Sequence, residues 1–246
     1  MNTRDKINTS STLRSVVKVV SGIIFGIALV VCTVMGSFAT FATNADYYKQ
    51  VQDELGVTHS SVGLSSDENM MIANDSLADY MAGRIDDMQV TVTNYGAEVQ
   101  LWSDQALKHM KDVRDLVSTW TTISWALAVY MACYIVYNVL SKRGRSRIVR
   151  AVIGTYETVG VVLAILAMSI IAFGFGDVFT IFHKIFFTNN DWLFPSNDLI
   201  VRLLPQQFFL NMAITGGVII AVVSILLLAV AIWYRVRETK LQNNQT

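Results

Sequence analysis

Long apolar runs alternate with polar segments along this chain. The four runs span residues 19–41, 118–140, 151–176 and 213–234. Each is long enough to cross a membrane as a helix, since about 20 residues span the hydrocarbon core. The sequence therefore predicts a membrane protein, mainly α, with four transmembrane helices. Cleavage of the first run as a signal peptide, near Ala42, is an alternative. We favour a span, because a signal peptide has an apolar region of about 7–15 residues.

The charged residues predict how these helices are oriented. The segments 1–18, 141–150 and 235–246 are basic, whereas the loop 42–117 is strongly acidic. Short segments rich in Lys and Arg stay on the cytoplasmic side of a membrane. We therefore expect a multi-pass protein of the cell membrane with both termini in the cytoplasm. The loop 42–117 and the segment 177–212 would then both be extracytoplasmic.

The acidic loop is long enough to form a small α+β domain. Apolar residues at helical spacing predict a helix over 45–55 that Gly56 closes. Ser65 and Glu68 have the spacing of a capping box for a second helix, which would stop at Gly83. Alternating apolar and polar residues around Asn94-Tyr95-Gly96 predict a hairpin. Ser103 is placed to cap a third helix that begins at Asp104.

The segment 177–212 is too polar to span a membrane and too aromatic for a solvated loop. It contains both prolines of the chain and eight Phe or Trp residues. Aromatic side chains settle at the membrane interface, and irregular backbone at that depth must be buried in protein or line a wet cavity. We therefore predict an interfacial or re-entrant segment between the third and fourth spans. His183 within it is a candidate functional residue, the alternative being an anchor with a solvated histidine.

The second candidate residue is His109, on the helix predicted from Asp104. It lies beside an apolar stripe, and Asp112 three residues later falls on the same face. A carboxylate there can orient an imidazole, although an ordinary surface pair fits the pattern too. The predicted topology brings His109 and His183 to a similar depth at the outer interface, which is more informative than either alone. The third histidine, His59, is expected to be solvated.

Two histidines at a lipid-accessible aromatic surface suit proton transfer on a lipid. One can act as a general base and the other as an acid or oxyanion stabiliser. A metal site formed with Asp112 or Asp191 is an alternative, but that ligand set is incomplete. A channel is disfavoured, because the spans contain almost no ionisable residues. A membrane scaffold or sensor with an acidic extracytoplasmic binding domain is the non-enzymatic alternative. We expect no cofactor, no bound metal and no nucleic-acid partner.

Several motifs, in order along the chain, resemble the Lit family, the lipoprotein intramolecular transacylases of low-GC Gram-positive bacteria. Residues 103–113 are similar to the family pattern S-D-x-A-L-x-H-x-x-D-V. The blocks F-H-K-I-F-F at 182–187 and N-D-W-L-F at 190–194 add to the resemblance. Residues 199–209 are similar to L-I-R-L-[LF]-P-E-x-F-F, except that Gln206 stands where that pattern has Glu. An acidic role at this position is therefore in doubt.

The resemblance implies a defined reaction. The substrate would be a lipoprotein in membrane lipid, whose N-terminal cysteine carries a diacylglyceryl group and a free α-amine. The sn-2 acyl chain would move to that amine, which gives a lyso-form lipoprotein without a covalent acyl-enzyme. The resemblance points to His109 and His183 as the essential pair, and Asp112, Asp191, Trp192 and Arg202 are weaker candidates for positioning. The sequence does not set the oligomeric state, and a monomer would suffice.

Overall fold

The computed structural model describes residues 3–141, 148–149, 151–152, 154, 165, 167–170 and 172–243. The chain forms two compact units. The first contains residues 1–34, 123–165 and 219–246, and the second contains 35–122 and 166–218. Most of the predicted third span, 151–176, lies outside the described residues. The count of four spans therefore stays a prediction.

Three described helices are long and apolar enough to cross a membrane. They are α1 (Thr3–Ala42), α5 (Asp104–Leu140) and α9 (Gln206–Asn243). Helix α5 joins the predicted outer helix and the predicted second span without a break, because no Gly or Pro interrupts its sequence. Helix α9 begins directly after Pro205, well before the predicted start of the fourth span at 213.

In the first unit, α1 packs against the second half of α5. The rings of Phe25 and Tyr134 stack with their centroids 4.7 Å apart. The Tyr130 hydroxyl donates to the Ser21 carbonyl at 2.6 Å. A Cβ added at Gly22 would lie 3.5 Å from the Tyr134 hydroxyl. The small residue at 22 therefore allows α1 and α5 to approach closely, as in other membrane helix pairs.

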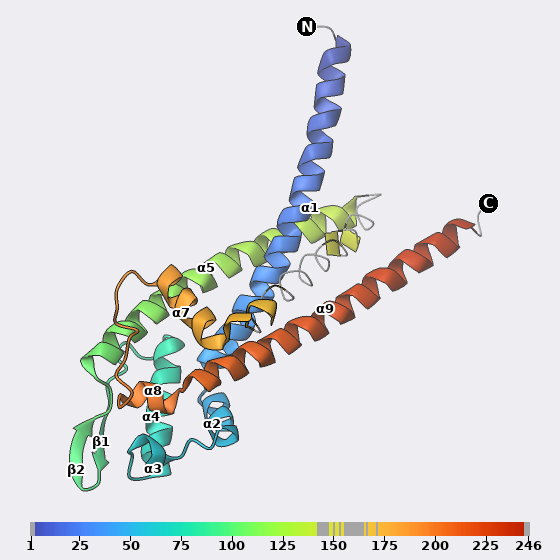
Figure 1. Cartoon of the computed structure of the whole chain (residues 1–246). Helices are drawn as coiled ribbons and strands as arrows, with labels where there is room; N and C mark the ends of the chain where they lie inside the picture. Colours follow the sequence, from blue (N-terminus) through green and yellow to red (C-terminus); the bar gives the residue numbers. More distant parts are fainter. Residues whose placement is uncertain are drawn as a thin grey trace. The chain divides into compact units, whose positions relative to one another are not determined.

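The second unit contains the short helices and the hairpin, which are labelled in Figure 1. Helices α2 (Ala45–Glu54), α3 (His59–Val62) and α4 (Asp67–Met81) precede the antiparallel hairpin of β1 (Thr91–Asn94) and β2 (Ala97–Gln100). Helices α7 (Phe175–Phe186) and α8 (Leu199–Leu203) come from the aromatic segment. Helix α4 contacts α2, α3 and β1, and α8 contacts α3. This is the small α+β layer that the sequence predicts for the acidic loop, here completed by α8.

The core of this unit is continuous from the acidic loop to the start of α9. Phe208, Leu203, Leu77 and Met70 are at most 1% exposed. The Gln52 and Asn74 side-chain amides pair reciprocally at 2.9 and 2.8 Å, and Gln52 also donates to the Leu203 carbonyl. These buried hydrogen bonds connect α2, α4 and α8, so they fix the aromatic segment to the outer layer.

Local sequence signals predicted most of these elements correctly and one of them wrongly. The hairpin is confirmed, with Tyr95 and Gly96 at positive φ in its two-residue turn. The Ser103 cap is confirmed by its Oγ, which accepts from the Ala106 amide at 3.1 Å. The predicted capping box at Ser65 is wrong, because Ser66 caps α4. The Ser65 amide instead donates to the Asn94 side chain at 2.7 Å, which holds it outside the helix.

Candidate functional site

Helix α5 places His109 in the interior of the second unit. Its apolar neighbours on the helix, Ala106 and Met110, are buried in the core, and His109 itself is only 7% exposed. Charged residues occupy the first turns of α5, whereas the rest is apolar. Because about 20 residues suffice to span a membrane, the 37 residues of α5 leave its first turns outside the span. With the second span predicted from 118, we expect His109 to belong to this extramembrane part.

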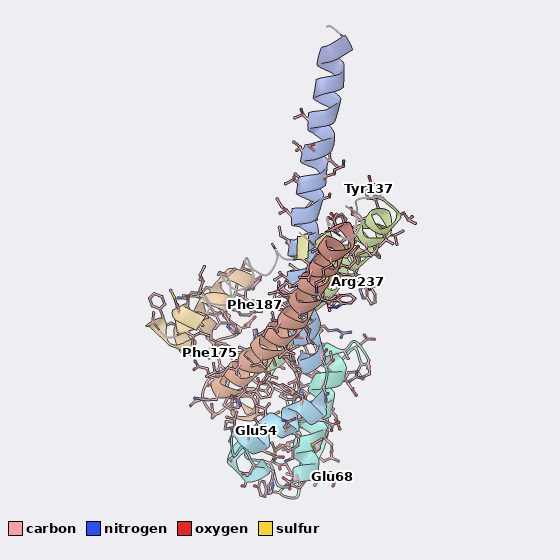
Figure 2. The ribbon with its side chains drawn as sticks, turned by 90° about the vertical axis from the view of Figure 1, so that its right-hand side faces the viewer. Glu54, Glu68, Tyr137, Phe175, Phe187 and Arg237 are labelled. Atoms are coloured by element: carbon pink, nitrogen blue, oxygen red, sulfur yellow. The ribbon has the colours of Figure 1, made fainter. Side chains whose placement is uncertain are left out.

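Helix α7 places His183 near its C-terminal end, one turn before Phe187. Figure 2 labels Phe175 and Phe187, which mark the two ends of this helix. His183 is also 7% exposed. Its Nδ1 lies 2.7 Å from the Phe179 carbonyl oxygen, four residues earlier. A carbonyl can only accept, so Nδ1 carries the proton and Nε2 keeps its lone pair in the neutral ring.

The structure brings the two histidines together from helices that are far apart in sequence. Their ring centroids are 5.8 Å apart and their planes are inclined by 31°. The Nδ1 atom of His109 is buried without a hydrogen-bond partner among the described residues. A buried unpaired polar atom costs free energy and calls for an explanation.

Aromatic rings enclose the histidine pair. The edges of Phe187 and Phe194 meet the His109 ring at centroid distances of 5.1 and 5.5 Å. Trp192 lies 5.1 Å from the His183 ring at an inclination of 32°, and Phe179 lies 4.2 Å from it on the same helix. These rings exclude water from the pair, which strengthens any electrostatic interaction with a substrate.

The enclosure also keeps both rings neutral. The pKa of His109 is lowered from 6.5 to about 4, mainly by burial and also by the neighbouring His183, while Asp112 and Asp191 oppose this change. Burial also lowers the pKa of His183, against the hydrogen bond to Phe179 that raises it. Each imidazole therefore has a free lone pair at neutral pH. Two buried titratable groups with shifted pKa values in one enclosure are typical of an active site.

A cleft of about 300 Å³ lies next to the histidine pair. Its polar wall includes Asp112, Asp115 and Asn189, and its apolar wall includes Phe187, whose ring contacts His109. Asn189 donates to Asp112 at 2.7 Å, so the carboxylate is held in place. The cleft thus combines negative charge with apolar surface, which suits an amphiphilic, positively charged group.

Of the other predicted site residues, Trp192 and Asp191 lie close to the histidine pair, whereas Arg202 has no described contact with it. Trp192 contacts the His183 ring, and its Nε1 donates to the Asn189 carbonyl at 3.0 Å. Asp191 lies on the same loop and acts on the pKa of His109. Arg202 is held elsewhere, because its guanidinium lies against Gly63, where an added Cβ would be 3.1 Å from it. No described contact joins Arg202 to either histidine.

The third histidine, His59, is not part of the pair, and the described residues offer no ligand set for the metal site considered as an alternative. His59 begins α3, and its Nδ1 lies 2.9 Å from Asp67 Oδ1, so it is paired rather than simply solvated. Among the described residues, no group of three or more His, Cys, Asp or Glu side chains is placed to hold a metal ion.

Sequence reasoning missed the residues that build the enclosure around the histidines. Phe194 and Phe187 were counted as interfacial aromatics, and no pattern indicated that they meet His109 edge-on. Gln105 was not singled out, yet its side chain reaches two carbonyls of the loop that follows α7. For Phe187 and Phe194 the signal available was their position in the resembled motifs, whereas Gln105 falls at a variable position of the pattern and had none.

The fold and the site together define a membrane-integral protein in which a small α+β unit encloses a histidine pair. A family model described as lipoprotein intramolecular transacylase Lit matches residues 23–209. The chain belongs to this family of acyltransferases. A search of curated proteins gave no match.

Solved structures agree with this assignment at the level of the fold. The membrane-integral lipoprotein intramolecular transacylase Lit of Bacillus cereus is 18% identical, with a TM-score of 0.67 over 92% of this chain and 99% of that one. A variant of the same protein with a histidine-to-arginine substitution is 20% identical, with a TM-score of 0.68 over 98% of this chain and 100% of that one. A histidine-to-alanine variant, also 20% identical, has a TM-score of 0.68 over 94% and 99%.

Proposed function

We propose that this protein moves the sn-2 acyl chain of a diacylglyceryl-cysteine to the α-amine of the same cysteine, using His109 and His183 as its catalytic residues. The substrate is an N-terminally lipidated lipoprotein in the membrane, and the product is its lyso-form. The observation that carries the proposal is the pair itself: two neutral histidines, each 7% exposed, with ring centroids 5.8 Å apart inside an aromatic enclosure.

The proposed reaction needs proton transfers but no outside reactant. The substrate ammonium first releases one proton to water. The free amine nitrogen then attacks the ester carbonyl, a C–N bond forms, and an oxyanion develops on the carbonyl oxygen. As the intermediate collapses, the ester C–O bond breaks and the glyceryl oxygen leaves. One proton passes from nitrogen to a histidine and from there to the departing oxygen. Amine and ester belong to one molecule, so an enclosure that folds the substrate gains the advantage of proximity.

The two histidines have different parts in this scheme. The Phe179 carbonyl holds the proton on Nδ1 of His183, so Nε2 can accept a proton. We therefore assign the general base to His183. His109 donates a hydrogen bond to the oxyanion, a role for which a neutral imidazole with a low pKa is suited. Each loss of such a donor typically lowers kcat by about 10²–10³.

The cleft beside the pair is the proposed binding site for the ammonium group of the substrate. An α-amine has a pKa of about 7.7–8.0, so most of it arrives protonated at neutral pH. Asp112 faces the cleft and is fixed by Asn189, and Asp115 lies one turn further along α5. These carboxylates would attract the ammonium, while Leu116 and Phe186 provide apolar surface for the attached lipid. Asp191 and Trp192 are proposed to act at the histidines instead, through the pKa of His109 and the contact with the His183 ring. Arg202 is proposed only as a support for the outer layer.

We also propose the membrane topology, with spans at residues 19–41, 118–140, 151–176 and 213–234. Four spans with both termini in the cytoplasm would put the histidine pair at the extracytoplasmic interface. Lipoproteins are exposed on that side, so the topology and the reaction agree.

The experiment that tests the function is tandem mass spectrometry of a lipopeptide substrate. The rearrangement leaves the intact mass unchanged, so fragment ions must place one acyl chain on the amine or on the glycerol. We expect purified protein to give the N-acyl product, and His109→Ala and His183→Ala to give none while still inserting into membranes. His59→Ala is the matched control and should keep full activity.

Three outcomes would contradict the proposal. Full activity of either variant of the pair would remove the direct role of the histidines. An unchanged diacylglyceryl-cysteine with well-folded wild-type protein would favour a scaffold or sensor that binds partners through its acidic outer unit. Loss of activity with a chelator and rescue by a divalent ion would replace acid–base catalysis with a metal site.

A further inference from the structure

The segment that covers the histidine pair is the connection from α7 to α8, residues 187–198. It contributes Phe187 and Phe194 to the surroundings of His109, and Trp192 to those of His183. This segment has no regular secondary structure over most of its length. Its shape must therefore be fixed by side chains from elsewhere, because its own backbone forms few hydrogen bonds.

Three side chains hold this segment, one from Ser103, which caps α5, and two from the first turns of α5. The Gln105 Nε2 donates to the carbonyls of Asp191 and Leu193, each at 3.0 Å. Ser103 donates to the Asp198 carboxylate at 2.7 Å, and Asn189 donates to Asp112 at 2.7 Å. These contacts hold the segment near its start at Asn189, in its middle at Asp191 and Leu193, and at its end at Asp198.

Gln105 is the central contact of the three. The two carbonyls that it binds flank Trp192 directly, so they set the direction of the indole side chain between them. Both N–H groups of the amide are used, which fixes the orientation of the segment more firmly than one hydrogen bond would. Helix α5 also carries His109, four residues after Gln105. One helix therefore positions His109 and, through Gln105, the 187–198 segment that covers both histidines.

We propose that Gln105 is a positioning residue for transacylation, which holds the 187–198 segment as a fixed aromatic cover over His109 and His183. The inference rests on the proposed function. It adds that the cover is maintained by hydrogen bonds from α5 to the loop backbone. Without these bonds, Trp192 and Phe194 would leave the histidines, and water would enter.

The test compares Gln105→Leu with Gln50→Leu in purified full-length protein. Leucine has a similar size but no donor at position 105. Gln50 is the matched control, because its amide forms only a surface contact with Glu54 at 3.1 Å. Two neutral hydrogen bonds are together worth roughly ten- to thirty-fold in an equilibrium. We expect kcat of Gln105→Leu to fall by about that factor, with wild-type activity in Gln50→Leu.

A second readout separates positioning from a general loss of folding. Water that reaches the pair would relieve the burial that lowers both histidine pKa values. The charged groups around His109 are Asp112 on α5 and Asp191 on the loop, with His183 opposite, and all three remain. The pH profile of kcat in Gln105→Leu should therefore gain an inflection closer to 6.5. Trp192 emission, obtained by subtracting the Trp192→Phe spectrum, should move to longer wavelength.

The outcomes distinguish this inference from the function on which it rests. If Gln105→Leu keeps wild-type kcat, pH profile and Trp192 emission while His109→Ala is inactive, the cover does not depend on Gln105. If activity falls only in proportion to the folded fraction, with an unchanged profile, Gln105 is merely structural. If His109→Ala is active, the proposed function itself fails.

Discussion

The lowered pKa of His109 makes a prediction about stability that does not depend on knowing the substrate. The folded protein disfavours protonation of this ring, because burial lowers its pKa from 6.5 to about 4. In the unfolded chain the ring is exposed and titrates near 6.5. Between these two values the unfolded state binds the proton and the folded state does not. Stability should therefore fall as the pH is lowered through this window.

The size of the effect follows from the two pKa values. At pH 5 the unfolded ring is almost fully protonated and the folded ring hardly at all, so the linkage amounts to about 2 kcal/mol. At pH 7 the same contribution is close to zero. His183 acts in the same direction, because its pKa is lowered too. For a chain of this size, about 2 kcal/mol corresponds to roughly 4–8 °C in the unfolding midpoint.

The assay is thermal unfolding in detergent at pH 7 and pH 5, for the wild type and His109→Gln. Glutamine does not titrate, so the variant should lose about 2 kcal/mol less between the two pH values. The acidic outer unit titrates in both proteins and cancels in the comparison. His59→Gln is the control, because that side chain is 35% exposed against Asp67. Equal losses for wild type and His109→Gln would show that the ring is not buried as a neutral base.

Three further predictions concern the core and the cleft. Phe208→Ala should lower the free energy of unfolding by about 3–5 kcal/mol, because its ring is fully buried. Phe209→Ala should lower it by less in the same assay, because that ring is only half-buried. Gln52→Leu should destabilise by about 1–3 kcal/mol for each group left unpaired, since Asn74 and the Leu203 carbonyl both lose a partner. Asp112→Asn should raise KM for the lipopeptide more than it lowers kcat. An unchanged KM would contradict the proposal that the substrate ammonium binds in the cleft.

Helical periodicity and turn chemistry were sufficient to predict the outer layer from the sequence. These signals are local, so Gly56, the Tyr95-Gly96 turn and Ser103 each acted where the pattern placed them. The error at α4 came from two adjacent serines that are both able to cap. Ser66 caps because the amide of Ser65 is bound by Asn94, which is distant in sequence. Only the folded hairpin decides between them.

The candidate site was predictable only to the level of its two histidines and their neighbourhood. Charge segregation predicts that His109 and His183 lie on one side of the membrane, but nothing in the pattern sets the distance between their rings. That distance depends on how α7 and the loop after it pack against α5. Trp192 and Asp112 were reasonable candidates by residue type, and both lie at the site. Arg202 was a candidate on the same grounds and lies against Gly63 instead.

The chemistry of the pair comes from the one part of the second unit that is least regular. Burial is the main cause that lowers the pKa of His109 to about 4, and the rings of Phe187 and Phe194 both contact its ring. Both belong to the segment 187–198, which a sequence pattern describes only as aromatic and broken by proline. A helix could have supplied such rings on only one face. A loop of turns and bends that side chains of α5 hold in place can curve around an imidazole. Its irregular backbone therefore allows aromatic residues to enclose both histidines.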